Sequence, residues 1–259
     1  MTVTLFEQST LSSARTSPFP PVLNGSFGSR LEAIRWDQVE ATLATNTHAV
    51  LPRLLTSAEC GRLVDLYAET RLFRSRIVME RYAFGRGEYK YFGYPLPDTV
   101  RELRVGLYEY LAPIANRWHQ AMRMDERFPP THEEFVAICD LAGQRRPTPL
   151  MLRYRPDDYC CLHQDLYGDH VFPFQVVFLL SRPGTDFTGG ELMLAETAPK
   201  KPGTVDVVQL DEGEAVIIPV NCRPVPGERR AYRSNVRHGV SKLRAGTRNT
   251  LGIIFHDAR

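Results

Sequence analysis

A series of short strand-like segments after Pro147 restricts the fold more than any other feature of this sequence. The segments are rich in apolar and β-branched residues and are separated by clusters of Gly, Pro, Asp and Asn. The strands expected from this pattern are 150–155, 171–181, 191–195, 205–210, 214–220 and 247–255. Short strands at this spacing are typical of two packed antiparallel sheets. Residues 148–259 are therefore expected to form a double-stranded β-helix, a jelly-roll or cupin-like core.

The residues before Pro147 have helical patterns instead. Thr56 followed by Glu59 resembles a capping box, and apolar residues at helical spacing come after it. The other elements expected here are helices over 36–43, 98–118 and 131–141 and a short strand within 48–55. We therefore expect an α+β fold in which a helical region, residues 31–147, buttresses the β-rich core within one integrated domain. Residues 1–30 are polar and turn-rich and are expected to form an N-terminal arm.

Composition excludes several other classes of protein. The chain of 259 residues is 43% hydrophobic and 24% charged, as in ordinary globular proteins and unlike collagen, coiled coils or disordered chains. It has neither a long apolar run nor a signal-peptide pattern, so we expect no membrane association. Five cysteines without CxxC spacing favour reduced thiols and a cytoplasmic location. The net charge of +2 is too small to require a polyanionic partner.

One histidine and one aspartate in the β-rich region form a candidate metal site. His163 and Asp165 are two residues apart, so in extended backbone their side chains project from the same face. One more imidazole would complete a set of two histidines and one carboxylate, and His238, just before the last expected strand, is the strongest candidate. Such a set leaves three positions of an octahedral metal open, as in non-haem iron(II) oxygenases, whereas structural zinc is closed by four protein ligands.

The other histidines are weaker candidates for the third ligand. His170 follows Asp165 too closely to reach around a barrel, and His256 lies beyond the last expected strand. Three more lie in helical or N-terminal context and are expected to be ordinary packing or surface residues: His48, His119 and His132. Because the pattern HxD is common, the assignment depends on the sequence that follows His238.

Ten residues after His238, an arginine begins an otherwise apolar strand. Strand alternation places Arg248 and Thr250 on one face of it and Leu251 on the other. An arginine inside a barrel needs an anion, and a dicarboxylate fits, since one carboxylate pairs with the guanidinium while the other end chelates iron. Tyr154 on a neighbouring strand can give a hydroxyl to the same carboxylate, so Arg248, Tyr154 and Thr250 are the expected co-substrate residues. The alternative is a surface Arg248 paired with an acidic residue.

These motifs resemble those of the 2-oxoglutarate- and iron(II)-dependent dioxygenases. Residues 153–156 (Arg-Tyr-Arg-Pro) and 162–165 (Leu-His-Gln-Asp) are similar to the metal segment of AlkB-type nucleic-acid dealkylases. The turn at 187–192 and the segment 238–248 are more similar to prolyl-hydroxylase-type members. Over about residues 45–258 the chain resembles a group of bacterial oxygenases described as acting on damaged DNA.

The resemblance implies an enzyme with iron(II), 2-oxoglutarate and O2 as cofactor and co-substrates. It implies that His163, Asp165 and His238 bind the iron and that Arg248 and Tyr154 bind the distal carboxylate of 2-oxoglutarate. The implied reaction converts 2-oxoglutarate to succinate and CO2 and hydroxylates a substrate C–H bond. On an N-methyl group the product collapses to formaldehyde and the free amine, which is oxidative dealkylation of a modified base.

The chain also departs from the AlkB pattern. Leu152 stands where AlkB-type enzymes usually have an asparagine, and Ile254 stands where they have a second arginine. Their base-flipping lid is not recognisable in residues 1–147. Base dealkylation is therefore one expected activity. The alternatives are hydroxylation of a protein side chain or small metabolite, and a non-catalytic jelly-roll binding module.

Two arginine-rich stretches are candidates for contact with a nucleic acid. Residues 71–94 contain six basic, two acidic and seven aromatic residues, and residues 223–237, which end just before His238, contain five basic and one acidic residue. Cations mixed with aromatic rings can follow a phosphate backbone and stack on unpaired bases, and we expect the second stretch at the pocket mouth. The alternatives are an aromatic packing surface between helices and barrel for the first stretch and a solvated loop for the second.

Overall fold

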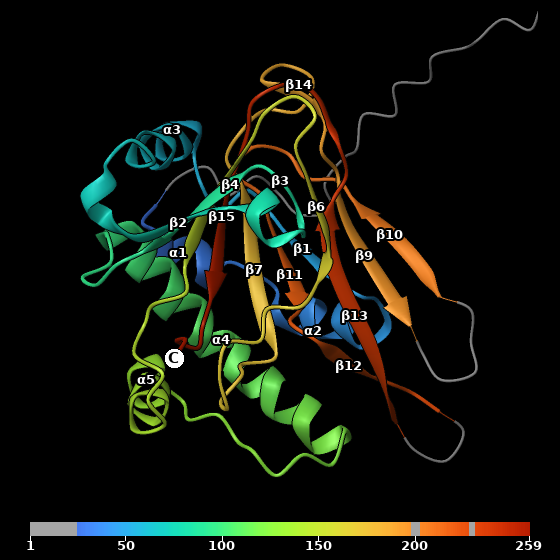
Figure 1. Cartoon of the computed structure of the whole chain (residues 1–259). Coiled ribbons are helices and arrows are strands. Elements are labelled where there is room, and N and C mark those ends of the chain that lie inside the picture. The colour runs from blue at the N-terminus through green and yellow to red at the C-terminus, as the bar shows by residue number, and fades with distance from the viewer. Residues whose placement is uncertain (1–24, 198–202, 228–230) are drawn as a thin grey trace, which may run out of the picture.

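Two antiparallel sheets face each other, and helices cover the outer side of the larger one (Figure 1). The computed structural model describes residues 25–197, 203–227 and 231–259. Most of the expected N-terminal arm, residues 1–24, lies outside the described residues. The last residues of that arm begin helix α1 (Phe27–Glu32). The expected α+β fold with a jelly-roll core is confirmed.

Among the described residues, the larger sheet contains seven strands, all paired antiparallel. In spatial order they are β1 (Ala49–Leu51), β11 (Ala215–Pro219), β7 (Phe174–Leu179), β15 (Arg248–Ile254), β5 (Leu150–Tyr154), β4 (Glu88–Phe92) and β2 (Phe73–Val78). The outer strands β2 and β4 come from the region expected to be helical. That region therefore extends the larger sheet as well as covering it.

The smaller sheet faces the larger one and carries the rest of the barrel wall. Its strands are β10 (Thr204–Val208), β9 (Leu192–Thr197), β13 (Tyr232–Val240), β6 (Tyr159–His163) and β3 (Gly85–Arg86), and β12 (Cys222–Val225) also pairs with β13. A separate pair joins β8 (Phe187–Gly189) and β14 (Leu243–Gly246). Apolar side chains from both sheets fill the space between them, including Leu179, Val216, Ile218, Leu194 and Val236.

Apart from α1, which was not predicted, the α-helices form where the sequence patterns predict them. Besides α1 they are α2 (Trp36–Thr45), α3 (Ser57–Leu66), α4 (Asp98–Ala121) and α5 (His132–Leu141), with short 3-10 turns η1 (Thr70–Leu72) and η2 (Met79–Tyr82). The capping box of α3 is complete, since the Thr56 hydroxyl accepts from the Glu59 amide and the Glu59 carboxylate accepts from the Thr56 amide. In the described part of the chain, no helix has the length and apolar character needed to cross a membrane.

Helix α4 packs its apolar stripe on the outer face of the larger sheet. Leu103, Leu107 and Leu111 are buried in the same cluster as Val176 of β7 and Ile253 of β15. Burial of such a side chain stabilises the fold by about 1.5–3 kcal/mol. This packing makes the larger sheet a rigid support for the site between the sheets.

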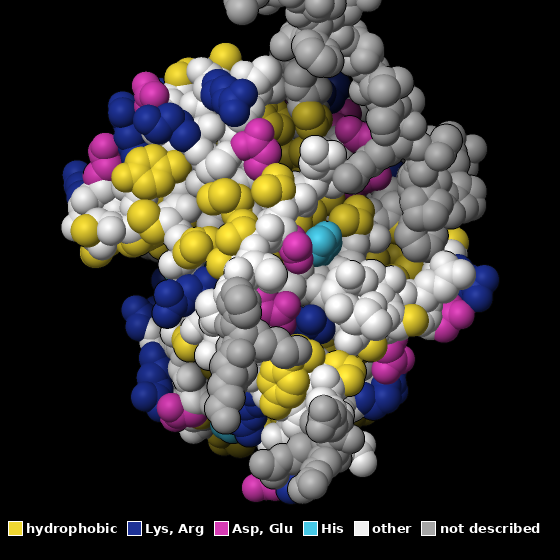
Figure 2. All heavy atoms as spheres, turned by 90° about the vertical axis from the view of Figure 1, so that its right-hand side faces the viewer, with side chains coloured by type: hydrophobic (Ala, Val, Ile, Leu, Met, Phe, Trp, Pro, Cys, Tyr) yellow, Lys and Arg dark blue, Asp and Glu magenta, His cyan; other side chains and the backbone are white. Residues whose placement is uncertain are grey.

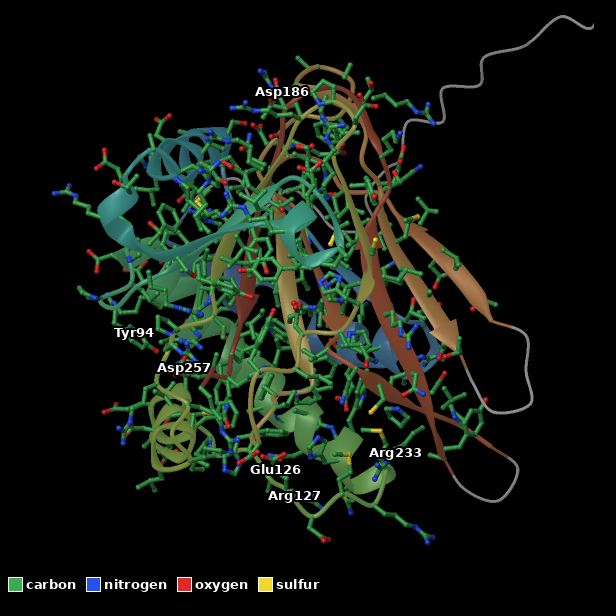
Figure 3. All side chains as sticks on the ribbon, viewed as in Figure 1. Tyr94, Glu126, Arg127, Asp186, Arg233 and Asp257 are labelled. Carbon is green, nitrogen blue, oxygen red and sulfur yellow. The ribbon has the colours of Figure 1, made fainter. Side chains whose placement is uncertain are left out.

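A buried ion pair also attaches α4 to the end of β15. Arg104 Nη2 donates to Asp257 Oδ1 at 2.7 Å and to the Phe255 carbonyl at 3.0 Å, and both charged side chains are 1% exposed. The Tyr94 hydroxyl donates to the other Asp257 oxygen at 2.8 Å, and Figure 3 shows these two residues beside each other. The carboxylate thus has donors on both oxygens, as a buried charge requires.

Candidate metal centre

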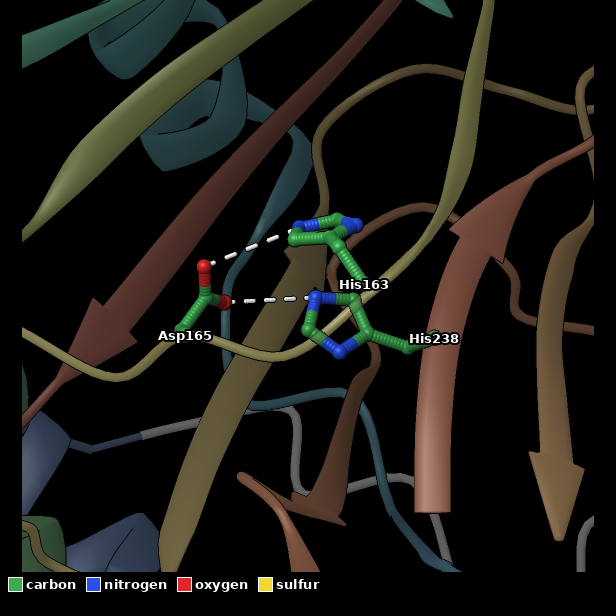
Figure 4. A group of neighbouring side chains, drawn as sticks. All are labelled: His163, Asp165 and His238. Carbon is green, nitrogen blue, oxygen red and sulfur yellow. Dashed lines mark ion pairs between the residues drawn. The ribbon is translucent and has the colours of Figure 1, made fainter. Parts of the chain in front are cut away.

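The smaller sheet brings His163, Asp165 and His238 together. His163 ends β6 directly opposite His238 of β13, and Asp165 lies just beyond the end of β6. Asp165 Oδ1 is 3.6 Å from His163 Nε2, and Asp165 Oδ2 is 3.2 Å from His238 Nε2 (Figure 4). One ligand atom from each residue lies within 4.8 Å of the other two, and among the described residues this is the one such His/Cys/Asp/Glu group.

An irregularity in the pairing of β6 with β13 turns His163 inward. His238 pairs with His163 and Val240 with Cys160, so β6 has one residue more than β13 between these pairs. In a regular strand, Cys160 and His163 would point to opposite faces, whereas here the Cys160 sulfur lies 3.6 Å from His163 Nδ1. Gly239 lies against this bulge, and a Cβ on it would come within 2.7 Å of the Cys160 carbonyl oxygen.

The pKa shifts of Asp165 and His163 favour the protonation states that bind a metal. Burial alone would raise the pKa of Asp165. Hydrogen bonding and charge interactions with His238 outweigh this effect, followed by the charge interaction with His163 and the hydrogen bond from the Tyr167 hydroxyl. Together they hold the pKa of Asp165 well below its ordinary value. Burial, followed by repulsion from His238, lowers the pKa of His163. Since His163 Nδ1 lies 2.9 Å from the Cys161 carbonyl, its proton belongs on Nδ1 and the Nε2 lone pair faces Asp165. An ionised carboxylate and a neutral imidazole are metal-binding forms.

The expected co-substrate residues lie on the inner face of the larger sheet. Arg248 of β15 pairs directly with Tyr154 of β5, and its guanidinium carbon is 5.7 Å from the Tyr154 ring centroid and 5.9 Å from that of Phe187. Thr250, buried, follows two residues later on the same face. Arg248 is 4% exposed, so a surface position for it is excluded.

Within the described part of the chain, one polar group at this position lacks a close counter-ion and another lacks a hydrogen-bond partner, although Glu191 attracts Arg248 at longer range. No carboxylate of the described residues lies within 4.0 Å of the Arg248 guanidinium, and the buried Tyr154 hydroxyl has no hydrogen-bond partner among the residues that the structure describes. Burial lowers the pKa of Arg248, the sign expected of a cation held away from water. A buried cation beside an unpaired hydroxyl is a fitting site for a carboxylate.

Comparison with known proteins identifies the family. A family model named Oxygenase-NA, described as an oxygenase catalysing oxidative methylation of damaged DNA, matches residues 87–258. The chain belongs to the Oxygenase-NA family. The protein is therefore an oxygenase. Two uncharacterized proteins of Mycobacterium tuberculosis, MT2286 and Rv2227, are each 42% identical over 167 residues, which is 64% of this chain and 72% of each relative.

Solved structures show the fold of this Oxygenase-NA member. A Pseudomonas putida prolyl-4-hydroxylase is similar with a TM-score of 0.51 at 15% identity, over 86% of this chain and 99% of the other. A 2OG-Fe(II) oxygenase family oxidoreductase from Burkholderia pseudomallei gives 0.51 at 17% identity, over 86% and 91% of the two chains. The resemblance to 2-oxoglutarate- and iron(II)-dependent dioxygenases is thus confirmed by the family and by the fold.

The remaining histidines of this Oxygenase-NA member lie outside the triad. His170 Nδ1 is 2.9 Å from Glu126 Oε1, and His256 Nδ1 accepts a hydrogen bond from the Phe172 amide. The other three contact neighbouring polar groups: His48 the Thr47 hydroxyl, His119 the Glu126 carbonyl and His132 the Phe255 carbonyl.

The first arginine-rich stretch, residues 71–94, forms β2, η2, β3 and β4 and divides its side chains between two surfaces. Phe84 is 6.4 Å from the His163 ring and 6.2 Å from the Tyr89 ring, so these two rings lie on the triad side. Phe73 and Phe92 instead pack in the apolar cluster between the helices and the larger sheet, as the alternative for this stretch expected. Arg76 and Arg86 instead line an outer hollow of about 240 Å³ and form ion pairs with acidic residues. Phe84 and Tyr89, rather than these arginines, therefore lie beside the triad.

The second arginine-rich stretch, residues 223–237, is neither a solvated loop nor wholly at the pocket mouth. It forms β12 and most of β13, apart from residues 228–230, which are not described. Arg223 is buried and paired with Glu196, and Arg237 projects from the face of β13 opposite to His238. In Figure 2, basic and acidic side chains of the described residues are interspersed with apolar ones, so the described part of that face presents no large area of one charge.

Proposed function

We propose that this oxygenase binds iron(II) through His163, Asp165 and His238 and uses 2-oxoglutarate and O2 to hydroxylate a C–H bond of a modified base in nucleic acid. The proposal is carried by one observation: the structure combines an open two-histidine, one-carboxylate set with a buried Arg248 that has no carboxylate within 4.0 Å among the described residues. When bound, the metal and keto acid supply the oxidising chemistry, with release of succinate and CO2.

The chain's own residues bind and orient the reactants. Arg248 forks onto the distal carboxylate of 2-oxoglutarate, and the Tyr154 hydroxyl donates to the same group, which satisfies both. Thr250 extends this inner face of β15. Because Tyr154 and Arg248 are buried, water is kept from the bound carboxylate and the ion pair is stronger than it would be in solvent.

A nucleic-acid base is the substrate that two features favour. The family description refers to damaged DNA. In addition, Phe84 and Tyr89 form an aromatic surface beside His163, and a planar unpaired base stacks on such a surface. Hydroxylation of an N-methyl group there would release formaldehyde and restore the unmodified base.

Turnover of a defined oligonucleotide tests this proposal. Purified protein with iron(II), 2-oxoglutarate and O2 is given a single-stranded oligonucleotide with N-methylated bases, or the same oligonucleotide without methyl groups. We expect succinate and formaldehyde in equal amounts with the methylated strand, little with the other, and none from Asp165→Ala. Succinate without loss of methyl groups would exclude this substrate and direct the search to protein side chains or metabolites. No succinate under any condition would overturn the reaction itself.

A further inference from the structure

A chain of tyrosine hydroxyls ends on the Asp165 carboxylate. The Tyr167 hydroxyl donates to Asp165 Oδ1 at 2.5 Å, and the Tyr91 hydroxyl donates to the Tyr167 oxygen at 2.8 Å. Tyr91 comes from β4 of the larger sheet, whereas Tyr167 and Asp165 lie in the segment after β6 of the smaller sheet. The hydroxyls therefore connect one sheet to the carboxylate held between the two histidines.

The Tyr167 ring is held between neighbours, so its hydroxyl has a fixed direction. Its centroid is 6.0 Å from that of Tyr91, in an edge-to-face arrangement, and 6.0 Å from that of His256. Tyr91 is in turn covered by the Arg74 guanidinium at 4.5 Å, whose Nε donates to the Pro147 carbonyl. A donor held in this way selects one orientation of the carboxylate that it contacts.

The two oxygens of Asp165 therefore have different surroundings. Oδ1 accepts the Tyr167 hydroxyl and lies 3.6 Å from His163 Nε2, while Oδ2 faces His238 Nε2 at the shorter distance of 3.2 Å and has no hydroxyl donor among the described residues. We infer that Tyr167 is a positioning residue that occupies Oδ1 and leaves Oδ2 as the oxygen that Asp165 gives to the metal. Binding through one oxygen keeps an extra coordination position free for the co-substrate or O2. This inference rests on the proposed function, because it concerns how the same metal is held.

Metal binding by the whole protein, without turnover, tests the inference. Tyr167→Phe keeps the ring and its packing and removes the hydroxyl. Loss of a group that orients a metal ligand typically weakens metal affinity about 10–100-fold. We therefore expect Tyr167→Phe to bind Mn2+ about 10–100-fold more weakly by titration calorimetry. We also expect the visible absorption bands of bound Co2+ to shift, since the freed carboxylate can offer both oxygens.

Tyr94→Phe is the matched control. Tyr94 also donates a hydroxyl to a carboxylate, Asp257 Oδ2, at 2.8 Å, but that carboxylate is outside the triad. Tyr94→Phe should lower Tm and leave both Mn2+ affinity and the Co2+ spectrum unchanged. Tyr91→Phe, which keeps the Tyr167–Asp165 contact, should weaken Mn2+ binding less than Tyr167→Phe does.

The outcomes separate this inference from the proposed function. If wild-type protein binds Mn2+ and Tyr167→Phe binds it equally tightly with the same Co2+ spectrum, Tyr167 is a packing residue and the inference is wrong, while the proposed iron site stands. If wild-type protein binds no divalent metal, the proposed function itself is wrong and the inference is overturned with it.

Discussion

Arg248 is a single residue that forms part of a binding site and lowers the stability of the folded protein. Its guanidinium is buried, and no described carboxylate is within 4.0 Å of it. A buried charge without a counter-ion destabilises the folded state, and an apolar residue of similar length removes that penalty. We therefore expect Arg248→Met to be at least as stable as wild type in the absence of ligand, by about 0–2 kcal/mol.

The same substitution should remove the response to the co-substrate. Wild-type protein with Mn2+ should show a rise in Tm as 2-oxoglutarate is added, because ligand binds only the folded state. Arg248→Met should show a much smaller rise at every concentration, measured by differential scanning calorimetry. A full 2-oxoglutarate response in Arg248→Met would contradict the role given to this arginine.

Gly239 is a residue at which one methyl group should alter the metal centre. A Cβ there would lie 2.7 Å from the Cys160 carbonyl oxygen and 3.2 Å from the Cys161 carbonyl carbon, both in the bulge that turns His163 inward. Backbone cannot yield as a flexible side chain can, so Gly239→Ala should destabilise the protein by about 1–3 kcal/mol and also weaken Mn2+ binding. Urea unfolding and calorimetric titration measure the two effects.

Gly61 offers a matched control for that substitution. It lies in the interior of α3, and a Cβ on it would meet nothing within 4 Å. Gly61→Ala should raise stability by about 0.5–1 kcal/mol, because alanine loses less conformational entropy in a helix, and should leave Mn2+ binding unchanged. Equal effects of the two substitutions would show that the clash at Gly239 is relieved elsewhere.

The sequence could predict those site residues whose role follows from their own side chain and its local spacing. His163, Asp165, His238 and Arg248 carry the chemistry in their own side chains, and spacing and strand alternation were enough to propose them. Tyr167 stands in the same segment, yet its contribution depends on Tyr91, 76 residues earlier in the chain.

At the scale of elements, the ion pair between Arg104 and Asp257 links helix α4 to the chain that follows β15. Removing one partner leaves the other charge buried, which typically costs about 3–5 kcal/mol. Asp257→Ala should therefore lower the free energy of unfolding by about that amount. The double variant Arg104→Met, Asp257→Ala should be less destabilised than the sum of the single variants, because it leaves no unpaired charge. Additive effects in urea unfolding would contradict this coupling.

Helices and strands with a recognisable local sequence pattern were predicted. Features that exist only through pairing with a distant strand were not. Helix α3 begins at the capping box of Thr56, and the stripe of α4 gives its buried face directly. Strand β13 was missed because its outward residues include Arg233 and Arg237, so that a charged segment resembles a loop. The bulge in β6 exists only through its pairing with β13, and no pattern within 159–163 encodes it.

In the molecule as a whole, two separate clusters of apolar side chains have different roles: one supports the larger sheet, and the other surrounds the candidate site. One cluster joins the helices to the outer face of the larger sheet, and the other fills the space between the sheets. The division into a helical region and a β-rich core therefore describes only part of the arrangement, since β2 and β4 from 71–94 complete the larger sheet beside β5. Charged and aromatic residues in 71–94 hid this strand pattern, because they do not divide simply by face. Tyr89 and Tyr91 lie on the inner side of the larger sheet, Phe73 and Phe92 pack with the helices on the outer side, and Arg76 is exposed.

The packing of helices on the larger sheet also makes stability depend on pH. Burial first, and then the charge of Arg104, lower the pKa of His132 to about 3 from 6.5, although its hydrogen bond to the Phe255 carbonyl acts in the opposite direction. Below pH 6.5 the unfolded chain takes up a proton at this residue and the folded protein does not, so stability is fully present above pH 6.5 and falls as the pH is lowered towards 3. Well below pH 6.5, this one group contributes a loss of about 1.4 kcal/mol for each pH unit.

His132→Gln isolates this contribution, because glutamine can donate to the Phe255 carbonyl but does not titrate. Urea unfolding in metal-free buffer between pH 7 and about pH 5 should show a steep loss of stability in wild type and a shallower loss in the variant. Metal is removed because binding at His163 and His238 has its own pH dependence. Other groups with the same sign, such as His256, whose pKa is also lowered to about 3 by burial, keep the variant's slope above zero. Equal slopes in the two proteins would contradict the lowered pKa of His132 in the folded protein.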